Sequence, residues 1–300
     1  MIQISGLTKE YGHRKVLDGL DLSIADGEAF GLLGPNGAVK TTIINCVCGL
    51  VRASAGSIMI HGTRVGSARD IQDIVGLAPQ EVSLIPRLTA RENLIFFGRL
   101  KGMEGERPSV RARELLEWIG LTPDADRQVG EYSRGMMQRV NIAISLMHDP
   151  ALLVLDEPTA GLDSEARALI WTLLKSLRAE NRTVLMATHD LEEAEHLCDR
   201  LAVIKAGVLK TEGTPEEIRR LAGHEVLRLV PHPGSRQDLE RLARAQGLEV
   251  VYRGDVAVLK GPELRAKLRV MLDELGDGLS GITYGQASFE DAFLSIVGDS

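Results

Sequence analysis

The chain has 300 residues, of which 44% are hydrophobic, 26% charged and 4% aromatic, and it carries a formal net charge of −7. This composition is typical of a globular protein with one large domain or two ordinary ones. The acidic balance argues against nucleic acid as a partner, and apolar runs such as ALLVL (151–155) are far too short to cross a bilayer. Because MIQISGLTKEYG lacks the features of a signal peptide, we expect a cytoplasmic protein that reaches a membrane only through a partner.

The N-terminal part of the chain predicts a phosphate-binding loop. Residues 1–27 predict two or three short strands with a turn at YGHRK, and EAFGLLG predicts a buried strand that leads through a glycine turn into a helix from Thr41 to Leu50. This order suits a phosphate site, because backbone N–H groups at a helix start attract phosphate. GPNGAVKTT fits the pattern G-x-x-x-x-G-K-[ST] at Gly34, Lys40 and Thr41, with Val39 in place of the second glycine.

Val39 leaves two readings of this loop open. Glycine is used at that position because the backbone needs a positive φ or because it lies against phosphate without a Cβ. In the first case a β-branched residue costs about 1–3 kcal/mol, or roughly a 5- to 150-fold loss of affinity. In the second case the valine methyls meet phosphate oxygens and the loop must rearrange. Because valine is bulky and stiff, we favour a strongly impaired site.

The section from about 85 to 148 is expected to be helical. LTARENLIFFGRL begins with a capping box formed by Thr89 and Glu92 ahead of periodic apolar residues. SRGMMQRVNIAISLM (133–147) also has apolar residues at helical spacing. The cysteines are odd in number and scattered, so we expect buried, reduced thiols rather than a metal pair; they are Cys46, Cys48 and Cys198.

After Pro150 the sequence alternates between strands and helices. ALLVLDEP and TVLMATHD are short, unbroken apolar runs typical of parallel strands covered on both faces. Ligands of such sheets bind at the carboxyl ends of strands, where Asp156, Glu157 and His189 fall. The next helix has a predicted capping box, Asp190 with Glu193. His189, Glu193 and His196 share one helix face, which resembles a metal site, but a solvated helix start explains them better.

A capped helix in GTPEEIRRLAG, with Thr214, Pro215 and Glu217 at its start, is expected to end the main domain near Gly223. Beyond it, EVLRLV, LEVVYRG and VAVLKG predict strands, and 236–246 and 262–275 predict helices. Residues 224–300 therefore predict a small α+β accessory domain to which no chemistry is assigned.

Seven motifs in a fixed order make the chain resemble the ATP-binding-cassette (ABC) ATPases. They are Tyr11 in LTKEYG, the loop GPNGAVKTT, Gln80 in LAPQE, the signature YSRGM at 132–136, LLVLDEP, AGLD at 160–163, and ATHD at 187–190. The signature departs from the family pattern, because Tyr132 replaces leucine and Arg134 replaces glycine. The tail, including SFEDAFLSI, is similar to the C-terminal extension of bacterial exporter subunits of the ABC-2 type.

The resemblance implies an α/β fold of the P-loop NTPase class, with a mixed sheet core, an antiparallel β subdomain and a helical signature subdomain at about 85–148. This ABC domain would span 1–223, and 224–300 would be the accessory domain. The cofactors implied are ATP and Mg²⁺. The residues expected to contact nucleotide are Tyr11, Gly34, Asn36, Gly37, Ala38, Val39, Lys40, Thr41, Thr42, Ser133, Gly135 and Asp163.

The resemblance also implies roles in hydrolysis. Glu157 would be the general base, His189 would clamp the γ-phosphate, and Gln80 would sense it. The residues expected around Mg²⁺ are Thr41, Gln80 and Asp156. Ser133 and Gly135 would close on ATP held by a second copy, or by a homologous subunit, in a head-to-tail dimer.

The expected function is that of an ATPase subunit that powers export through an integral-membrane permease, peripheral on the inner face of the cell membrane. Since Lys40, Asp156, Glu157 and His189 are all present, Val39 is interpreted as an isolated lesion in a hydrolytic design. The alternative is a non-hydrolysing, degenerate cassette that regulates a heterodimeric transporter. A soluble ABC ATPase of translation or DNA repair is disfavoured, because the chain has neither two cassettes nor a long heptad insertion.

Overall fold

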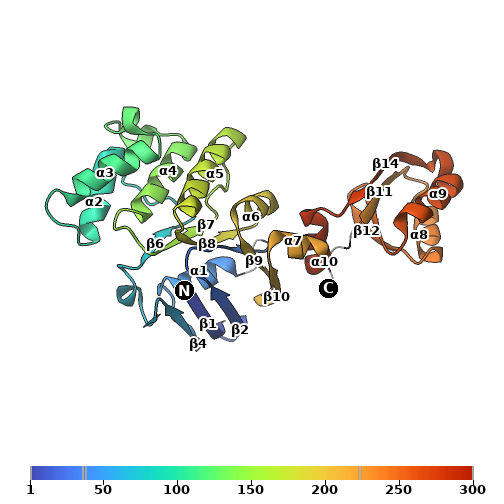
Figure 1. Cartoon of the computed structure of the whole chain (residues 1–300), viewed down its shortest axis with the longest axis horizontal. Helices are drawn as coiled ribbons and strands as arrows, with labels where there is room; N and C mark the ends of the chain where they lie inside the picture. Colours follow the sequence, from blue (N-terminus) through green and yellow to red (C-terminus); the bar gives the residue numbers. More distant parts are fainter. Residues whose placement is uncertain (1, 36, 38, 222, 224, 299–300) are drawn as a thin grey trace. The chain divides into compact units, whose positions relative to one another are not determined.

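The computed structural model describes residues 2–35, 37, 39–221, 223 and 225–298 (Figure 1). Contacts divide the chain between Pro215 and Glu216 into two compact units, which are described separately below. This division falls shortly before Gly223, the boundary expected from the sequence. No helix among the described residues combines the length and the apolar character needed to span a membrane.

The first unit is built on a six-stranded sheet in the order β10-β9-β3-β8-β7-β6. Every neighbouring pair is parallel except β9 with β10, which is antiparallel. The strands are β3 (Ala29–Leu33), β6 (Val75–Ala78), β7 (Leu152–Asp156), β8 (Thr183–Thr188), β9 (Arg200–Lys205) and β10 (Val208–Gly213). Residues of β3, β7 and β8 are all buried, which is why these segments read as unbroken apolar runs.

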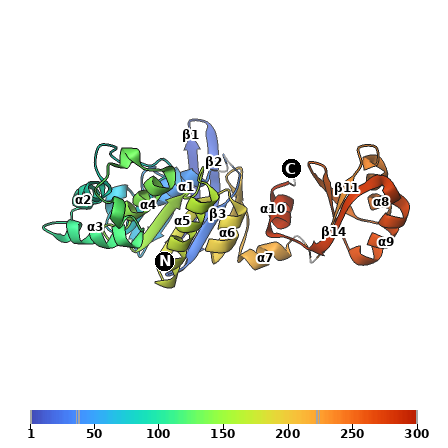
Figure 2. The same ribbon diagram turned by 90° about the horizontal axis from the view of Figure 1, so that it is seen from above.

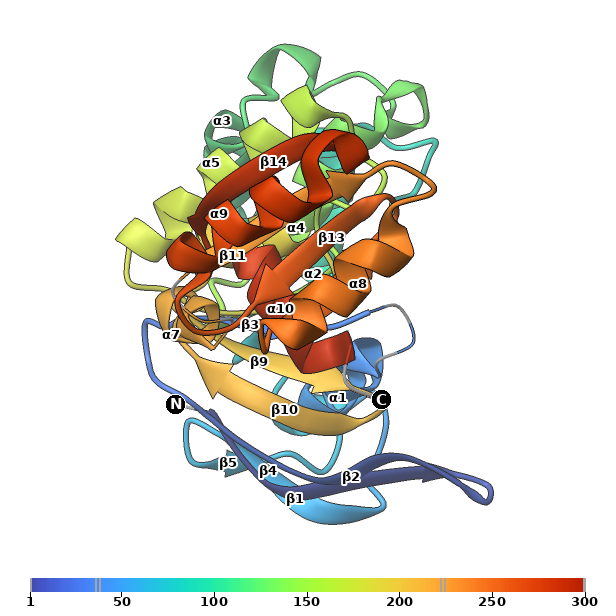
Figure 3. The same cartoon turned by 90° about the vertical axis from the view of Figure 1, so that its right-hand side faces the viewer.

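A second, antiparallel sheet in the order β2-β1-β4-β5 packs on the same core (Figure 3). Its strands are β1 (Ile2–Tyr11), β2 (Arg14–Ile24), β4 (Ala55–Ile60) and β5 (Thr63–Arg64). The β1–β2 hairpin is longer than the short strands predicted for residues 1–27. Helix α1 (Lys40–Val47) supplies Ile43, Ile44 and Val47 to the core that both sheets share.

Helices cover one end of the first unit, where α2, α3, α4 and α5 lie together (Figure 1). They are α2 (Ala90–Leu100), α3 (Arg107–Trp118), α4 (Arg134–Ser145) and α5 (Ser164–Ala179), followed by α6 (Leu191–Leu197) and α7 (Pro215–Arg220). The capping box of Thr89 and Glu92 is confirmed, because each side chain bonds the other residue's backbone N–H. Short 3₁₀ turns occur at 68–70, 122–124, 129–131 and 276–278.

The three cysteines are free and buried, as expected. Cys46 and Cys48 lie at the end of α1, and Cys198 follows α6; each is at most 5% exposed. Burial raises the pKa of the Cys48 thiol to about 12 and also raises that of Cys198.

The second unit has the chain order β-α-β-β-α-β with the strands arranged as β12-β13-β11-β14, which is a ferredoxin-like topology. Its elements are β11 (Glu225–Pro231), α8 (Arg236–Ala245), β12 (Glu249–Arg253), β13 (Val256–Lys260), α9 (Leu264–Leu275), β14 (Leu279–Gln286) and α10 (Phe289–Gly298). Figure 2 shows α8 and α9 on one side of this sheet and α10 on the other. An ion pair between Arg228 of β11 and the buried Asp291 of α10 joins α10 to the sheet.

Candidate functional site

Three neighbouring strands of the first unit end at one edge of the sheet, and each continues into a segment predicted to carry chemistry. Strand β3 leads into the loop that begins at Gly34, β7 ends at Asp156, and β8 leads to His189. The register pairs Leu33 with Thr188 and Asp156 with Ala187, so these carboxyl ends are level. Asn36 and Ala38, both predicted to contact nucleotide, lie outside the described residues.

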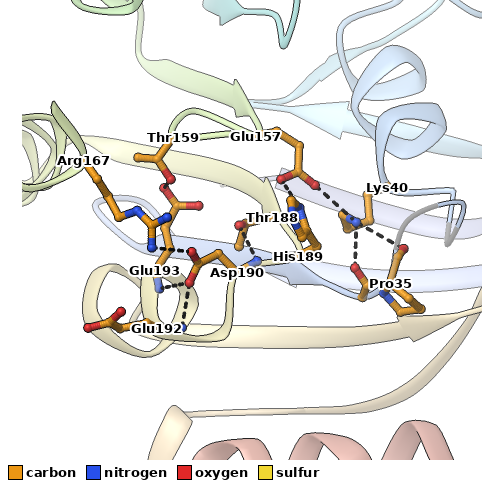
Figure 4. Close-up of polar contacts among 11 residues, drawn as sticks. Pro35, Lys40, Glu157, Thr159, Arg167, Thr188, His189, Asp190, Glu192 and Glu193 are labelled. Atoms are coloured by element: carbon orange, nitrogen blue, oxygen red, sulfur yellow. Dashed lines mark hydrogen bonds and ion pairs between the residues drawn. The ribbon is translucent and has the colours of Figure 1, made fainter. Parts of the chain in front are cut away.

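The Lys40 ammonium lies inside the phosphate-loop segment. Its Nζ donates to the carbonyl oxygen of Gly34 at 2.7 Å and to that of Pro35 at 3.3 Å, and it lies 3.4 Å from Glu157 Oε1 (Figure 4). The lysine side chain is only 6% exposed. The positive charge is therefore held at the start of α1, where a phosphate group would need it.

Glu157 joins the lysine to the histidine. Its Oε2 lies 2.6 Å from His189 Nδ1, while its other oxygen faces Lys40 (Figure 4). The Glu157 side chain is 7% exposed and that of His189 is 46% exposed. The Glu157 backbone has a φ of 51°, a left-handed conformation that is uncommon for a residue with a side chain, and its N–H bonds Ala187 O at 2.8 Å. Such strain persists at sites where the surroundings hold it in place.

Asp156 and Thr41 offer oxygen atoms that suit Mg²⁺. The Asp156 side chain is buried and bonds the Thr41 hydroxyl, and its Oδ1 has no partner within the described part of the chain. Burial raises the pKa of Asp156, and the Thr41 hydroxyl offsets part of that effect. A buried carboxylate oxygen without a partner, next to a hydroxyl at a helix start, fits a hard cation that takes few protein ligands.

Val39 has a left-handed backbone, with φ 74° and ψ 14°, and it precedes α1 as the cap residue without a side-chain cap bond. Its side chain is half-buried and packs against the hydrophobic core of the first unit. Glycine is used at this position for one of two reasons, and the structure shows the first of them, because the backbone φ of Val39 is positive. Gly37, in the same loop, also has a positive φ of 81°.

Gln80 lies beyond β6, is exposed, and shares a cavity of about 260 Å³ with Glu157. The other residues that line this cavity are Val82, Arg134, Met137, Gln138, Ala160 and Leu162. The cavity therefore brings the predicted sensor and the predicted base together, with Arg134 of the signature beside them.

The remaining signature residues gather where α4 and α5 begin. Ser133 caps α4 by accepting from Met136 N at 3.2 Å, and Asp163 caps α5 by accepting from Ala166 N at 2.8 Å. A Cβ on Gly135 would come 2.6 Å from Ala166 Cβ, so glycine is needed there for the close approach of α5. Ser133 and Asp163 thus stabilise the N-termini of α4 and α5 as helix caps within this chain.

Tyr11 and Thr42 complete the predicted nucleotide contacts. Tyr11 ends β1, is 50% exposed, and has the Lys9 ammonium 4.7 Å from its ring centroid. Thr42 lies in the first turn of α1 and is half-buried. The Tyr11 ring is therefore accessible to solvent, and the Lys9 ammonium makes a cation–π contact with it.

The interpretation of Glu193 as part of a solvated helix start is wrong, because its side chain is only 1% exposed. Its Oε1 accepts from Thr159 Oγ1 at 2.9 Å (Figure 4), and the side chain also bonds the Thr188 hydroxyl. The predicted capping box is half right. Asp190 does cap α6, but its own N–H donates to Thr188 Oγ1 rather than to Glu193.

The other two members of that helix face also have different neighbours. His196 stacks on Trp171 with ring centroids 5.4 Å apart, whereas His189 bonds Glu157. Over the residues that the structure describes, no group of three or more His, Cys, Asp or Glu side chains could hold a metal ion. The sequence signal nearest to Glu193 is Thr188, which ends β8 five residues earlier, but nothing in the local sequence shows that the Glu193 side chain is buried.

A second cavity of about 530 Å³ lies between the sheet and the helices of the first unit. It is lined by Phe97 and Leu100 of α2, by Asn141 and Ile144 of α4, and by residues near β6 such as Leu77. Leu100 is 71% exposed and Phe96, next to Phe97, is 45% exposed. This side of α2 is therefore an apolar surface open to solvent.

Comparison with known proteins gives consistent matches. The profile of the ABC transporter family matches residues 17–160. The chain is 41% identical over 303 positions to the Nod factor export ATP-binding protein I of Burkholderia lata, covering 99% of this chain and 97% of that protein. It is 40% identical over 231 positions to the linearmycin resistance ATP-binding protein LnrL of Bacillus subtilis, covering 76% and 74%.

Solved structures of ATP-binding cassettes also resemble this chain. The dimeric ATP-binding cassette MJ0796 bound to ADP and Pi is 30% identical, with a TM-score of 0.65 over 71% of this chain and 98% of that one. The ATP-binding cassette MJ1267 is 27% identical, with a TM-score of 0.68 over 74% and 94%. Both likenesses concern most of the cassette and about three-quarters of this chain.

Proposed function

The chain belongs to the ABC transporter family as an ATP-binding subunit, and from that premise we propose that it binds and hydrolyses ATP to drive export through a separate permease. The observation that carries the proposal is the convergence of Lys40, Glu157 and His189 at the carboxyl ends of three adjacent strands. The relative named for Nod factor export, which this chain matches over nearly its whole length, supports the direction of transport. The cargo is left open, since none of these residues would touch it.

Lys40 would contact the β- and γ-phosphates of ATP. Its ammonium would exchange the carbonyl oxygens of Gly34 and Pro35, and the carboxylate of Glu157, for phosphate oxygens. Glu157, released from the lysine, would then be able to accept a proton from water, with His189 holding its second oxygen. Gln80 would reach the same water from the shared cavity.

Thr41 and Asp156, with Gln80, would hold Mg²⁺, which when bound supplies neutralisation of phosphate charge. Ser133 and Gly135 would face the ATP held by a second copy or by a homologous subunit. The dimeric cassette in the structure bound to ADP and Pi supports this arrangement. Tyr11, Gly37, Thr42 and the loop residues beside them would complete the contacts to ATP.

The permease would dock at the apolar cavity beside α2 and place this chain on the inner face of the cell membrane. The cavity includes Ser83 and Phe97, from the 81–97 stretch expected to meet the membrane subunit. Exposed Leu100 at its rim would be covered by that contact.

A second candidate is a non-hydrolysing cassette in a heterodimer, and the strained Val39 is the observation that favours it. Glu157 is the residue that separates the two candidates. In the full chain and in its Val39→Gly variant, we expect Glu157→Gln to keep ATP binding but to lower kcat by about 10²- to 10⁴-fold, as for loss of a general base.

The measurements are ATP affinity by calorimetry and phosphate release. Glu165→Gln, which removes an exposed carboxylate on α5, is the control and should leave both values unchanged. If the Val39→Gly chain binds ATP but releases no phosphate with or without the permease, the hydrolytic proposal fails and the second candidate stands.

A further inference from the structure

We propose that Glu193, a buried carboxylate outside the proposed reaction, is a positioning residue that holds the segments carrying Glu157 and His189 at their working distance. The inference rests on the proposed function, because it concerns the base and the histidine of that site. Two hydroxyl groups bond this one side chain, that of Thr159 in the turn after β7 and that of Thr188 at the end of β8.

The first hydroxyl belongs to the segment of the base. Thr159 follows Glu157 by two residues, is 3% exposed, and donates to Glu193 Oε1 at 2.9 Å. Its carbonyl oxygen also accepts from Leu162 N at 3.2 Å, and Ala160 N donates to Glu157 O at 3.2 Å. Glu193 is therefore bonded directly to the turn that begins at the left-handed Glu157.

The second hydroxyl belongs to the segment of the histidine. Thr188 immediately precedes His189, is fully buried, and its hydroxyl bonds Glu193 while accepting from Asp190 N at 3.0 Å. Glu193 thus joins the turn after β7 to the end of β8. Figure 4 shows Glu193 and Thr159 on the side of Glu157 and His189 away from Lys40. The contact that depends on this spacing is the 2.6 Å approach of His189 Nδ1 to Glu157 Oε2.

Strain at Glu157 explains why such a link is needed. A non-glycine residue at a positive φ relaxes unless its surroundings fix it, and a shift of about 1 Å in a reacting group can cost roughly 100-fold in rate. Burial raises the pKa of Glu193, and the neighbouring carboxylates Asp190 and Glu157 raise it further. Arg167, the cation near this segment, forms its ion pair with Asp190. The two hydroxyl bonds are consequently what keeps this polar side chain buried in place.

The test compares variants of Glu193 in the full chain, with and without Val39→Gly. Glu193→Leu removes both bonds at similar volume, and we expect kcat to fall about 10- to 100-fold while KM for ATP stays within about twofold. Glu193→Gln keeps a group that can accept from one hydroxyl and donate to the other, so kcat should recover to within about threefold of the parent. Glu192→Gln, an exposed neighbour on α6, is the matched control and should behave as the parent.

Thr159→Val removes the hydrogen bond between Thr159 and Glu193 from the threonine side. If Thr159 and Glu193 act together, the Thr159→Val, Glu193→Leu double variant should lose no more rate than Glu193→Leu alone. A Glu193→Leu chain with the parent's kcat would overturn the proposal. So would a Glu193→Gln chain as impaired as Glu193→Leu, or additive losses in the double variant.

A measurement that does not need hydrolysis separates this proposal from the proposed function. Ring ¹⁵N spectra of His189 in the nucleotide-free chain report whether Nδ1 is bonded to Glu157. We expect Glu193→Leu to move these signals and Glu193→Gln to leave them near the parent's positions. Absence of ATPase activity in every chain would refute the proposed function alone, whereas unchanged ¹⁵N signals in Glu193→Leu would refute the role of Glu193.

Discussion

At the scale of single residues, Val39 is expected to determine how tightly the loop binds ATP. The valine has a left-handed backbone, a conformation that strains a β-branched residue by about 1–3 kcal/mol. Its side chain packs against the core rather than being free to turn away. Relief of this strain is therefore expected to appear both in stability and in binding.

We expect Val39→Gly to raise the melting temperature and to tighten ATP binding by about 5- to 150-fold, since glycine adopts this conformation without penalty. Val39→Ala, which removes the β-branch but keeps a Cβ, should fall between the two. Calorimetry with ATP and thermal unfolding of the three chains measure the series. A glycine chain that binds no better than the parent would show that Val39 is not an isolated lesion.

Glu193 makes stability depend on pH. Burial raises the pKa of this carboxyl from 4.5 to about 7. Between these values the folded chain keeps a proton that the unfolded chain has released, so the free energy of unfolding falls as the pH rises through this window. Glu193→Gln has no such proton to lose.

We therefore expect the melting temperature of the parent to fall relative to that of Glu193→Gln as the pH rises from about 5 to about 8. Circular dichroism melts at four pH values measure the difference. Glu192→Gln should follow the parent throughout. Parallel curves for the parent and Glu193→Gln would contradict the prediction.

At the scale of elements, short-range sequence patterns predicted helices and strands of the first unit. They did not predict features that depend on contacts between distant segments. The capping box of Thr89 and Glu92 was predictable because both partners lie within one helical turn. Strands β7 and β8 were predictable because burial on both faces makes them continuously apolar. Glu193 was misread because its partners, Thr159 and Thr188, come from other segments of the chain.

Helix α2 is the element on which the permease contact is expected to depend. Leu100→Glu places a charge on an exposed position at the rim of the apolar cavity, so it should leave the melting temperature nearly unchanged but prevent co-purification with the permease. Leu169→Glu on α5 changes a side chain that is 46% exposed and outside the lining of that cavity, and it is the matched control. Equal recovery of the permease with both variants would exclude this surface.

At the scale of the whole molecule, the sequence predicted two parts of different character but not the arrangement of the second. Alternating strands and helices from 225 onward indicated an α+β unit, whereas the strand order β12-β13-β11-β14 depends on pairings between distant segments. In the first unit, Lys40 and Glu157 could be assigned from motifs. Their approach to 3.4 Å could not, because it depends on the register of the sheet.

The proposed head-to-tail dimer can be tested by mixing two inactive variants, because each of its ATP sites would need residues from both chains. Lys40→Ala would disable the loop side of a site and Ser133→Arg the signature side, so either variant alone should lack ATPase activity. Mixed together, each heterodimer would contain one site with both defects and one intact site, restoring up to about a quarter of the active sites. Phosphate release from the mixture, absent from each variant separately, is the measurement; an inactive mixture of well-folded chains would argue against shared sites.

The burial of all three cysteines has a practical consequence for such experiments. A thiolate must form and be reached before an alkylating reagent can attack it, and the folded chain prevents both. A single cysteine placed on the surface would then carry nearly all of a spin label or fluorophore, with no need to replace the native ones. Slow labelling of the unaltered chain would in turn report how often its core opens.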